Sequence, residues 1–182
     1  SERGIRDRED TGAGETFSLK AVVVRKSKTE DLFKRAELMR RDSVHGPFKG
    51  TIRVEEESDT LVMNGNPVKF IYADNPSDID YSKHNINNAI LIDNTGVYRD
   101  ESGLSRHLES KGISKVLLTA PTKGGLKNIV YGVNHKDILE KDKILGAASC
   151  TTNAIVPLLK AISEEYGICL LYTSPSPRDA YV

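Results

Sequence analysis

Two short apolar runs with a helical segment between them constrain the fold of this chain more than any other feature. The runs are Ala89–Asp93 and Lys115–Thr119, which both predict buried strands, and Ser102–Ser110 lies between them. A strand, a helix and a second strand at this spacing predict a right-handed βαβ crossover and a parallel sheet. Two further short strands are predicted at Lys20–Arg25 and Lys143–Ala147.

The remaining segments also fit an α/β protein. Thr29–Arg41 has the approximate apolar spacing of a helix, and Asn64-Gly65 between two strand-like runs is a strong hairpin signal. Thr151–Tyr166 predicts a second long helix with one apolar face, which Pro157 should bend. The order of the elements indicates a nucleotide-binding α/β protein.

Composition excludes several classes of protein. Lys and Arg total 26, as do Asp and Glu, so the zero net charge argues against a general nucleic-acid or anionic-membrane binder. The two cysteines, Cys150 and Cys169, have neither a disulfide pattern nor metal-ligand spacing. No apolar run approaches the roughly 18 residues that span a bilayer. The charged start has no signal-peptide pattern. We therefore expect a cytoplasmic protein without a bound metal, membrane or nucleic acid.

The segment Ala148–Asn153 (ASCTTN) contains the candidate nucleophile. Cys150 lies between small residues directly before the predicted helix. The positive end of a helix dipole and its unpaired N–H groups stabilise a thiolate, which is the reactive form of cysteine. The alternative is a small buried cysteine with a purely structural role. The local sequence alone leaves these two interpretations open.

Several segments besides this one carry a resemblance to a known family. They are Asp42–Gly50 (DSVHGPFKG), Asn94–Val97 (NTGV), Thr119–Thr122 (TAPT), Gly132–His135 (GVNH) and Ala148–Ile155 (ASCTTNAI). Their order and spacing over residues 18–168 resemble the phosphorylating glyceraldehyde-3-phosphate dehydrogenase family, in particular a long bacterial-type branch. The resemblance implies a Rossmann-like parallel sheet with helices on both faces, incomplete at the N-terminus, plus the first helix of a catalytic domain.

The resemblance also implies roles for individual residues. Cys150 would attack an aldehyde and carry the acyl group as a thioester, which inorganic phosphate then attacks. Ser149 and Thr151 match positions that bind substrate or phosphate. The implied substrates are glyceraldehyde 3-phosphate and inorganic phosphate, and the implied assembly is a homotetramer.

The cofactor implied by the resemblance is NAD or NADP. Thr95, Gly96 and Thr119 would contact the dinucleotide at the strand ends. The acidic residue that holds the ribose in the family pattern is absent from the segment Arg25–Lys28 (RKSK), in which Ser27 stands nearest the expected position. The positive charge of Arg25 and Lys26 and the Ser27 hydroxyl suit a 2′-phosphate, which suggests NADP, alone or alongside NAD.

Other departures from the family pattern set the expected domain organisation. The chain lacks a G-x-G-x-x-G turn, and none of its histidines matches the activating histidine of the family. We expect a dinucleotide-binding domain at 1–149 without its first strand and glycine-rich turn, the start of a catalytic domain at 150–168, and a non-native tail at 169–182. The chain as written is then expected to be an inactive fragment.

Two other functions remain open from the sequence. Erythrose-4-phosphate dehydrogenase has a very similar cysteine motif, so it is an alternative enzymatic activity. A nucleotide-binding module without catalysis is the alternative from a different class.

Overall fold

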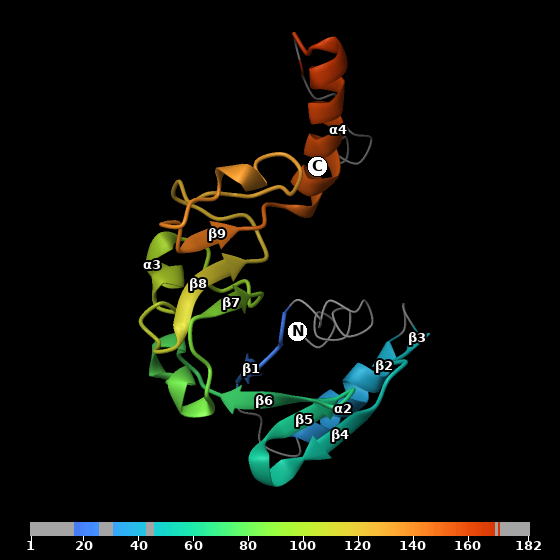
Figure 1. Cartoon of the computed structure of the whole chain (residues 1–182), viewed down its shortest axis with the longest axis vertical. Coiled ribbons are helices and arrows are strands. Elements are labelled where there is room, and N and C mark those ends of the chain that lie inside the picture. The colour runs from blue at the N-terminus through green and yellow to red at the C-terminus, as the bar shows by residue number, and fades with distance from the viewer. Residues whose placement is uncertain (1–16, 26–30, 43–45, 170, 172–182) are drawn as a thin grey trace, which may run out of the picture.

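The computed structural model describes residues 17–25, 31–42, 46–169 and 171. The described strands form two larger sheets and a small two-stranded ladder. Figure 1 shows an elongated arrangement in which the first sheet lies at one end, the second lies in the middle and a long helix projects from the other end.

The first sheet combines one parallel pair with an antiparallel meander. Its order is β1-β6-β5-β4, with β1 parallel to β6. The predicted hairpin joins β5 and β6, and its turn residues Asn64 and Gly65 have φ values of 48° and 83°. Positive φ at both positions is typical of a type I′ turn, so the hairpin prediction is confirmed. The strands are β1 (Ala21–Val24), β4 (Ile52–Glu55), β5 (Thr60–Met63) and β6 (Asn66–Tyr72).

Helix α2 (Asp31–Arg40) packs against this sheet, and the two-residue strands β2 (Arg41–Asp42) and β3 (Gly46–Pro47) follow it. The helix buries Leu32, Ala36 and Met39, which recur every three to four residues. Phe33 and Leu38 also belong to the apolar pattern that predicts this helix, but they lie outside this stripe and are exposed.

The second sheet confirms the parallel arrangement. Its order is β7-β8-β9 and both pairings are parallel. The helix between the first two strands ends at Ser105 instead of Ser110, because the next amides bond to carbonyls three residues back, such as Leu108 N–H to Ser105 O at 2.9 Å. The elements are β7 (Ala89–Asp93), α3 (Glu101–Ser105), β8 (Ile113–Leu118) and β9 (Ile144–Gly146).

The prediction of a buried strand at Ala89–Asp93 is wrong for one face of the strand. Ile90 and Ile92 of β7 are 54% and 59% exposed, whereas Asp93 is buried. Strand β7 pairs only with β8 among the described strands, and no described element covers the face that carries the two isoleucines.

A small apolar cluster joins the two sheets. Ile71 of β6 packs with Ile79, Tyr81 and Ile86, and Ala89 of β7 lies against this group. The chain between β6 and β7 forms two 3₁₀ turns, η3 (Pro76–Asp78) and η4 (Tyr81–His84). Another such turn, η2 (Glu56–Ser58), joins β4 to β5 in the first sheet. Because the cluster draws side chains from both sheets, it fixes their relative positions.

The long helix α4 (Cys150–Tyr166) follows β9, after a loop that contains η5 (His135–Asp137). It continues through Pro157 and ends at Tyr166, and Gly167 follows it with a φ of 73°. The expected bend at Pro157 stays a prediction. The apolar side chains of α4 are largely exposed, including Leu158 at 67%. No helix in the described part of the chain is both long enough and apolar enough to cross a membrane.

Candidate functional site

The candidate site lies at one edge of the second sheet. Strands β7, β8 and β9 are parallel, so their carboxyl ends meet at the same edge. The chain leaves these ends toward Thr95, Thr119 and Cys150, respectively. Ligands of open α/β sheets bind outside the carboxyl ends of the strands, so the topology brings three of the predicted residues to the appropriate edge.

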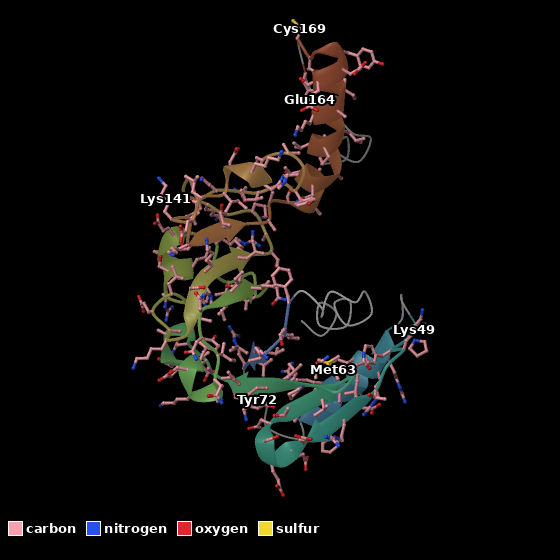
Figure 2. All side chains as sticks on the ribbon, viewed as in Figure 1. Lys49, Met63, Tyr72, Lys141, Glu164 and Cys169 are labelled. Carbon is pink, nitrogen blue, oxygen red and sulfur yellow. The ribbon has the colours of Figure 1, made fainter. Side chains whose placement is uncertain are left out.

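Cys150 is the first residue of α4 and its side chain is exposed. The prediction that it stands at a helix start is therefore confirmed, and a sealed structural position is excluded. The second cysteine, Cys169, is also free, and Figure 2 shows it at the opposite end of α4. A helix of 17 residues is about 25 Å long, which is far beyond the span of a disulfide.

Ser149 and Asn153 fix the backbone just before the thiol. Ser149 caps α4, since its Oγ accepts a hydrogen bond from Thr152 N–H at 3.0 Å. The Asn153 side-chain amide donates to the carbonyl oxygens of Ala147 at 2.7 Å and Ser149 at 2.8 Å. Ala148 between these carbonyls has a left-handed φ of 59°. The turn from β9 into α4 is thus held by side chains on both sides of Cys150.

The same bonds leave donors beside the thiol. The first hydrogen bond within the helix runs from Asn153 N–H to Ser149 O at 2.9 Å, and Ser149 Oγ accepts a hydrogen bond from Thr152 N–H. The N–H groups of Cys150 and Thr151 precede these bonds, so the helix itself does not use them. Two amides at the positive end of the helix can stabilise an anion next to the sulfur.

Thr95 and Thr119 both bind Asp93, the last residue of β7. Thr95 donates its N–H and its hydroxyl to Asp93 Oδ1, each at 2.8 Å. Thr119 donates its N–H at 2.9 Å and its hydroxyl at 3.2 Å to the main-chain oxygen of Asp93. Asp93 therefore connects the two threonines that were predicted to contact the cofactor.

Asp93 is also paired with a buried histidine that the sequence interpretation did not use. His107 Nε2 lies 3.0 Å from Asp93 Oδ2, and the side chains are 9% and 0% exposed. Burial by itself raises the pKa of Asp93, but hydrogen bonds from His107 and Thr95 outweigh this effect and hold the pKa below its usual value. Asp93 is therefore an ionised carboxylate at neutral pH.

The loops around the site are joined to one another. Lys123 N–H donates to Arg99 O at 2.7 Å, which connects the loop after β8 to the loop after β7. Ala147 N–H donates to Leu118 O at 2.8 Å, so the turn before Cys150 is attached to the end of β8. Lys160 of α4 donates to Gly132 O at 2.8 Å. The edge is consequently one hydrogen-bonded unit.

The remaining predicted residues are only partly described. Arg25 follows β1 in the first sheet and is exposed, and the described contacts do not join it to Thr95 or Cys150. Lys26 lies outside the described residues. Within the part of the chain that the structure covers, no group of His, Cys, Asp and Glu side chains is arranged to hold a metal ion.

The parallel strands, the loops at their carboxyl ends and the helix that begins after β9 define an α/β protein of the Rossmann type. Residues 13–101 match the family described as "Glyceraldehyde 3-phosphate dehydrogenase, NAD binding domain". This chain belongs to the glyceraldehyde-3-phosphate dehydrogenase family, and the recognised domain binds NAD(P).

Several curated relatives support this assignment. A glyceraldehyde-3-phosphate dehydrogenase-like protein of Pseudomonas aeruginosa is 59% identical over 160 residues, covering 88% of this chain and 35% of the relative. Glyceraldehyde-3-phosphate dehydrogenases of Ogataea parapolymorpha and Mycoplasma pneumoniae are 39% and 37% identical, each across 73% of this chain and 38% of the relative. The chain thus spans little more than a third of the length of these relatives.

Proposed function

We propose that the whole protein that carries this chain oxidises glyceraldehyde 3-phosphate to an acyl phosphate, with NAD or NADP and inorganic phosphate. The observation that carries this proposal is the exposed Cys150 thiol at the start of α4, at the same sheet edge as Thr95 and Thr119. Family membership supports a dehydrogenase of this type.

The residues at the edge fit a dinucleotide. Thr95 and Gly96 are exposed, Gly96 has φ 74°, and the space where its side chain would stand is open. A glycine in this conformation lets a ligand approach the backbone closely. The bound dinucleotide would supply the acceptor for the hydride that leaves the substrate carbon.

Cys150 would carry the covalent chemistry. Its thiolate attacks the aldehyde carbon, forming a C–S bond and an oxyanion that the amides of Cys150 and Thr151 can stabilise. Loss of hydride from that carbon, with its two electrons, converts the adduct into a thioester. A phosphate oxygen then attacks the thioester carbon, the C–S bond breaks and the thiolate is regenerated.

Finer assignments belong to the same proposal. Thr151 is exposed beside the thiol, so its hydroxyl is available to phosphate. The Ser149 hydroxyl already caps α4, which makes its contribution to phosphate binding secondary to its capping bond. Use of NADP would depend on the positive charge of Arg25 and Lys26.

The experiment compares Cys150→Ser with Glu165→Ala, an exposed position on the same helix, in the whole protein. Formation of reduced cofactor is followed with glyceraldehyde 3-phosphate, with and without inorganic phosphate. We expect Cys150→Ser to abolish turnover and Glu165→Ala to retain it. Equal activity of the two variants would refute the proposed nucleophile. Faster turnover with erythrose 4-phosphate would instead assign the alternative substrate.

A further experiment tests the class of protein. Iodoacetamide labels exposed thiolates, and the Cys150 thiol is exposed. In the whole protein we expect Cys150 to react faster than a free thiol such as glutathione, and we expect saturating NAD to alter its rate. If the protein binds NAD but shows no turnover, and Cys150 reacts no faster than the free thiol, the non-catalytic module is favoured.

A further inference from the structure

The buried pair of Asp93 and His107 is the strongest feature that the proposed chemistry leaves unexplained. Both side chains lie behind the exposed Thr95–Gly96 turn, and they are 0% and 9% exposed. His107 Nδ1 is buried without a hydrogen-bond partner among the described residues. Burying a charge and an unsatisfied ring nitrogen costs stability, and an apolar pair of similar volume is often at least as stable. Stability alone therefore does not account for this arrangement.

The bonds of Asp93 dictate the proton arrangement of the pair. An ionised carboxylate only accepts hydrogen bonds, so His107 must donate through Nε2. Thr95 must likewise donate its hydroxyl proton to Asp93 Oδ1, over 2.8 Å. The proton of this hydrogen bond therefore lies on His107 Nε2, facing the carboxylate. The Tyr98 ring packs against the imidazole in a T-shaped arrangement, with 5.6 Å between centroids.

This arrangement determines what the Thr95 hydroxyl can offer to a ligand. Its proton is committed to Asp93, and Val97 N–H donates to its oxygen at 3.2 Å. A hydroxyl has one proton and two lone pairs, so one lone pair remains. The exposed Thr95 can therefore accept a hydrogen bond from a ligand but has no proton left to donate.

We propose that Asp93 and His107 are positioning residues that hold the Thr95–Gly96 turn and make the Thr95 hydroxyl an acceptor for a ribose hydroxyl of the bound dinucleotide. This inference rests on the proposed function, because it assumes that the turn faces the cofactor. A ribose hydroxyl can donate, whereas a phosphate oxygen can only accept and would also approach the negative charge of Asp93. Thr119 extends the role of Asp93, since it is held by the main-chain oxygen of the same residue.

The first test concerns the hydroxyl of Thr95. The dissociation constant of NAD is measured calorimetrically in the whole protein for wild type, Thr95→Val and Thr95→Ser. Valine has a similar shape without the hydroxyl, and we expect it to weaken binding about five- to tenfold, as loss of one hydrogen bond does. Serine should restore affinity to within about twofold, because it retains the acceptor. Wild-type affinity in Thr95→Val would overturn the acceptor role.

Deoxyribose analogues of NAD identify the partner group. The analogue that lacks the donating hydroxyl should bind wild type and Thr95→Val equally, whereas other analogues should retain the difference. A loss of affinity in Thr95→Val that is identical for NAD and every deoxy analogue would refute recognition of a ribose hydroxyl.

The second test separates positioning from general stability. His107→Gln retains a side-chain N–H that can reach Asp93, whereas His107→Leu does not. We expect His107→Leu to weaken NAD binding about tenfold and His107→Gln to bind within about twofold of wild type. The matched control is Ser110→Ala, because Ser110 is buried on the same segment and donates to Pro76 O but does not touch the turn. Equal losses of affinity in His107→Leu and Ser110→Ala would reduce the pair to a structural role.

The NMR signal of the Thr95 amide gives a readout that needs no cofactor. This amide donates to a carboxylate at 2.8 Å, so its proton should resonate downfield in wild type and in His107→Gln and should shift in His107→Leu. The same signal in all three proteins would overturn the positioning role. Absence of NAD binding by the wild type would overturn the proposed function, and the Thr95 signal would then decide the positioning role alone.

Discussion

Asn153 offers the sharpest perturbation of the turn that holds the nucleophile. Its amide donates to Ala147 O and Ser149 O, and Ser149 O also receives the Asn153 main-chain N–H at 2.9 Å. Asn153→Ala therefore removes both side-chain bonds but leaves Ser149 O a partner. Each exposed bond is worth about 0.5–1.5 kcal/mol, and alanine recovers roughly 0.5 kcal/mol through helix propensity. We expect a net loss of about 1 kcal/mol in the free energy of unfolding.

Asn153→Asp tests the donor separately from the shape. The carboxylate would face two carbonyl oxygens, although the helix N-terminus favours negative charge by about 0.3–1 kcal/mol. We expect a loss of about 1–2 kcal/mol, measured by urea unfolding. The control is Glu165→Ala, an exposed substitution on α4 far from the turn, which should change stability by less than about 0.5 kcal/mol.

The bonds of Asn153 predict that its two variants are less stable than Glu165→Ala. If Asn153→Ala and Asn153→Asp both unfold like wild type, the amide does not hold the turn in solution. If Glu165→Ala loses as much as Asn153→Ala, the effect belongs to the helix in general. In the whole protein, Asn153→Ala should also lower kcat although it leaves Cys150 unchanged, because a loosened turn misplaces the thiol.

Three further predictions concern the framework of the site. Gly112→Ala should lose about 3–4 kcal/mol in the free energy of unfolding in urea, because φ is 101° and the new methyl group would lie 2.3 Å from Ile86 O. Gly65→Ala, at φ 83° in open space, should lose only about 1 kcal/mol. Equal losses in the two variants would disprove the clash. Burial raises the pKa of Tyr81 from 10.0 to about 12, so its contribution to the free energy of unfolding is complete below pH 10.0 and is lost as the pH rises toward 12. Tyr81→Phe should remove this loss of stability at alkaline pH, which is about 2 kcal/mol. Because the pKa of Asp93 is lowered in the folded state, its carboxylate stabilises the fold above pH 3.8, and this stability is lost as the pH falls further. Asp93→Asn should therefore lose less stability between pH 3.8 and lower pH than wild type, and the same pH dependence in both proteins would contradict this expectation.

The sequence was informative wherever structure depends on local patterns. The hairpin at Asn64-Gly65 follows from two adjacent residues that tolerate positive φ, and the start of α4 follows from the apolar helical pattern that begins directly after Cys150. The parallel order of β7 and β8 follows from the handedness and length of the connection. In each case the deciding interaction lies within a few residues or within one crossover.

Prediction failed where burial depends on what covers an element. The apolar run Ala89–Asp93 predicts a buried strand, but the sequence does not specify which strand or helix covers each of its faces. Ile90 and Ile92 are exposed for this reason, although the strand itself forms as expected. The same applies to Phe33 and Leu38 on α2, whose burial depends on the width of the sheet beneath them.

The role of Asp93 was partly accessible from the sequence. An aspartate two residues before a threonine is typical of a turn in which the carboxylate binds the following backbone, and Asp93 does accept the amide of Thr95. The pairing with His107 was not accessible, since it depends on where the chain returns after α3. Local turn chemistry could therefore have identified the acceptor, but only tertiary structure identifies its partner.

The arrangement of the site follows from the parallel sheet rather than from one contiguous motif. The thiol comes from the chain after β9, while Thr95 and Thr119 come from the chain after β7 and β8. Parallel strands deliver all three to one edge, and Asp93 then fixes the two hydroxyls through its carboxylate and its main-chain oxygen. A substitution at Asp93 should consequently displace both threonines, whereas Asp93 does not bond to Cys150. It should therefore reduce NAD affinity by a larger factor than it changes the rate at which Cys150 is alkylated in the absence of cofactor. A parallel loss of both would mean that Asp93 supports the sheet edge as a whole and has no separate influence on cofactor binding.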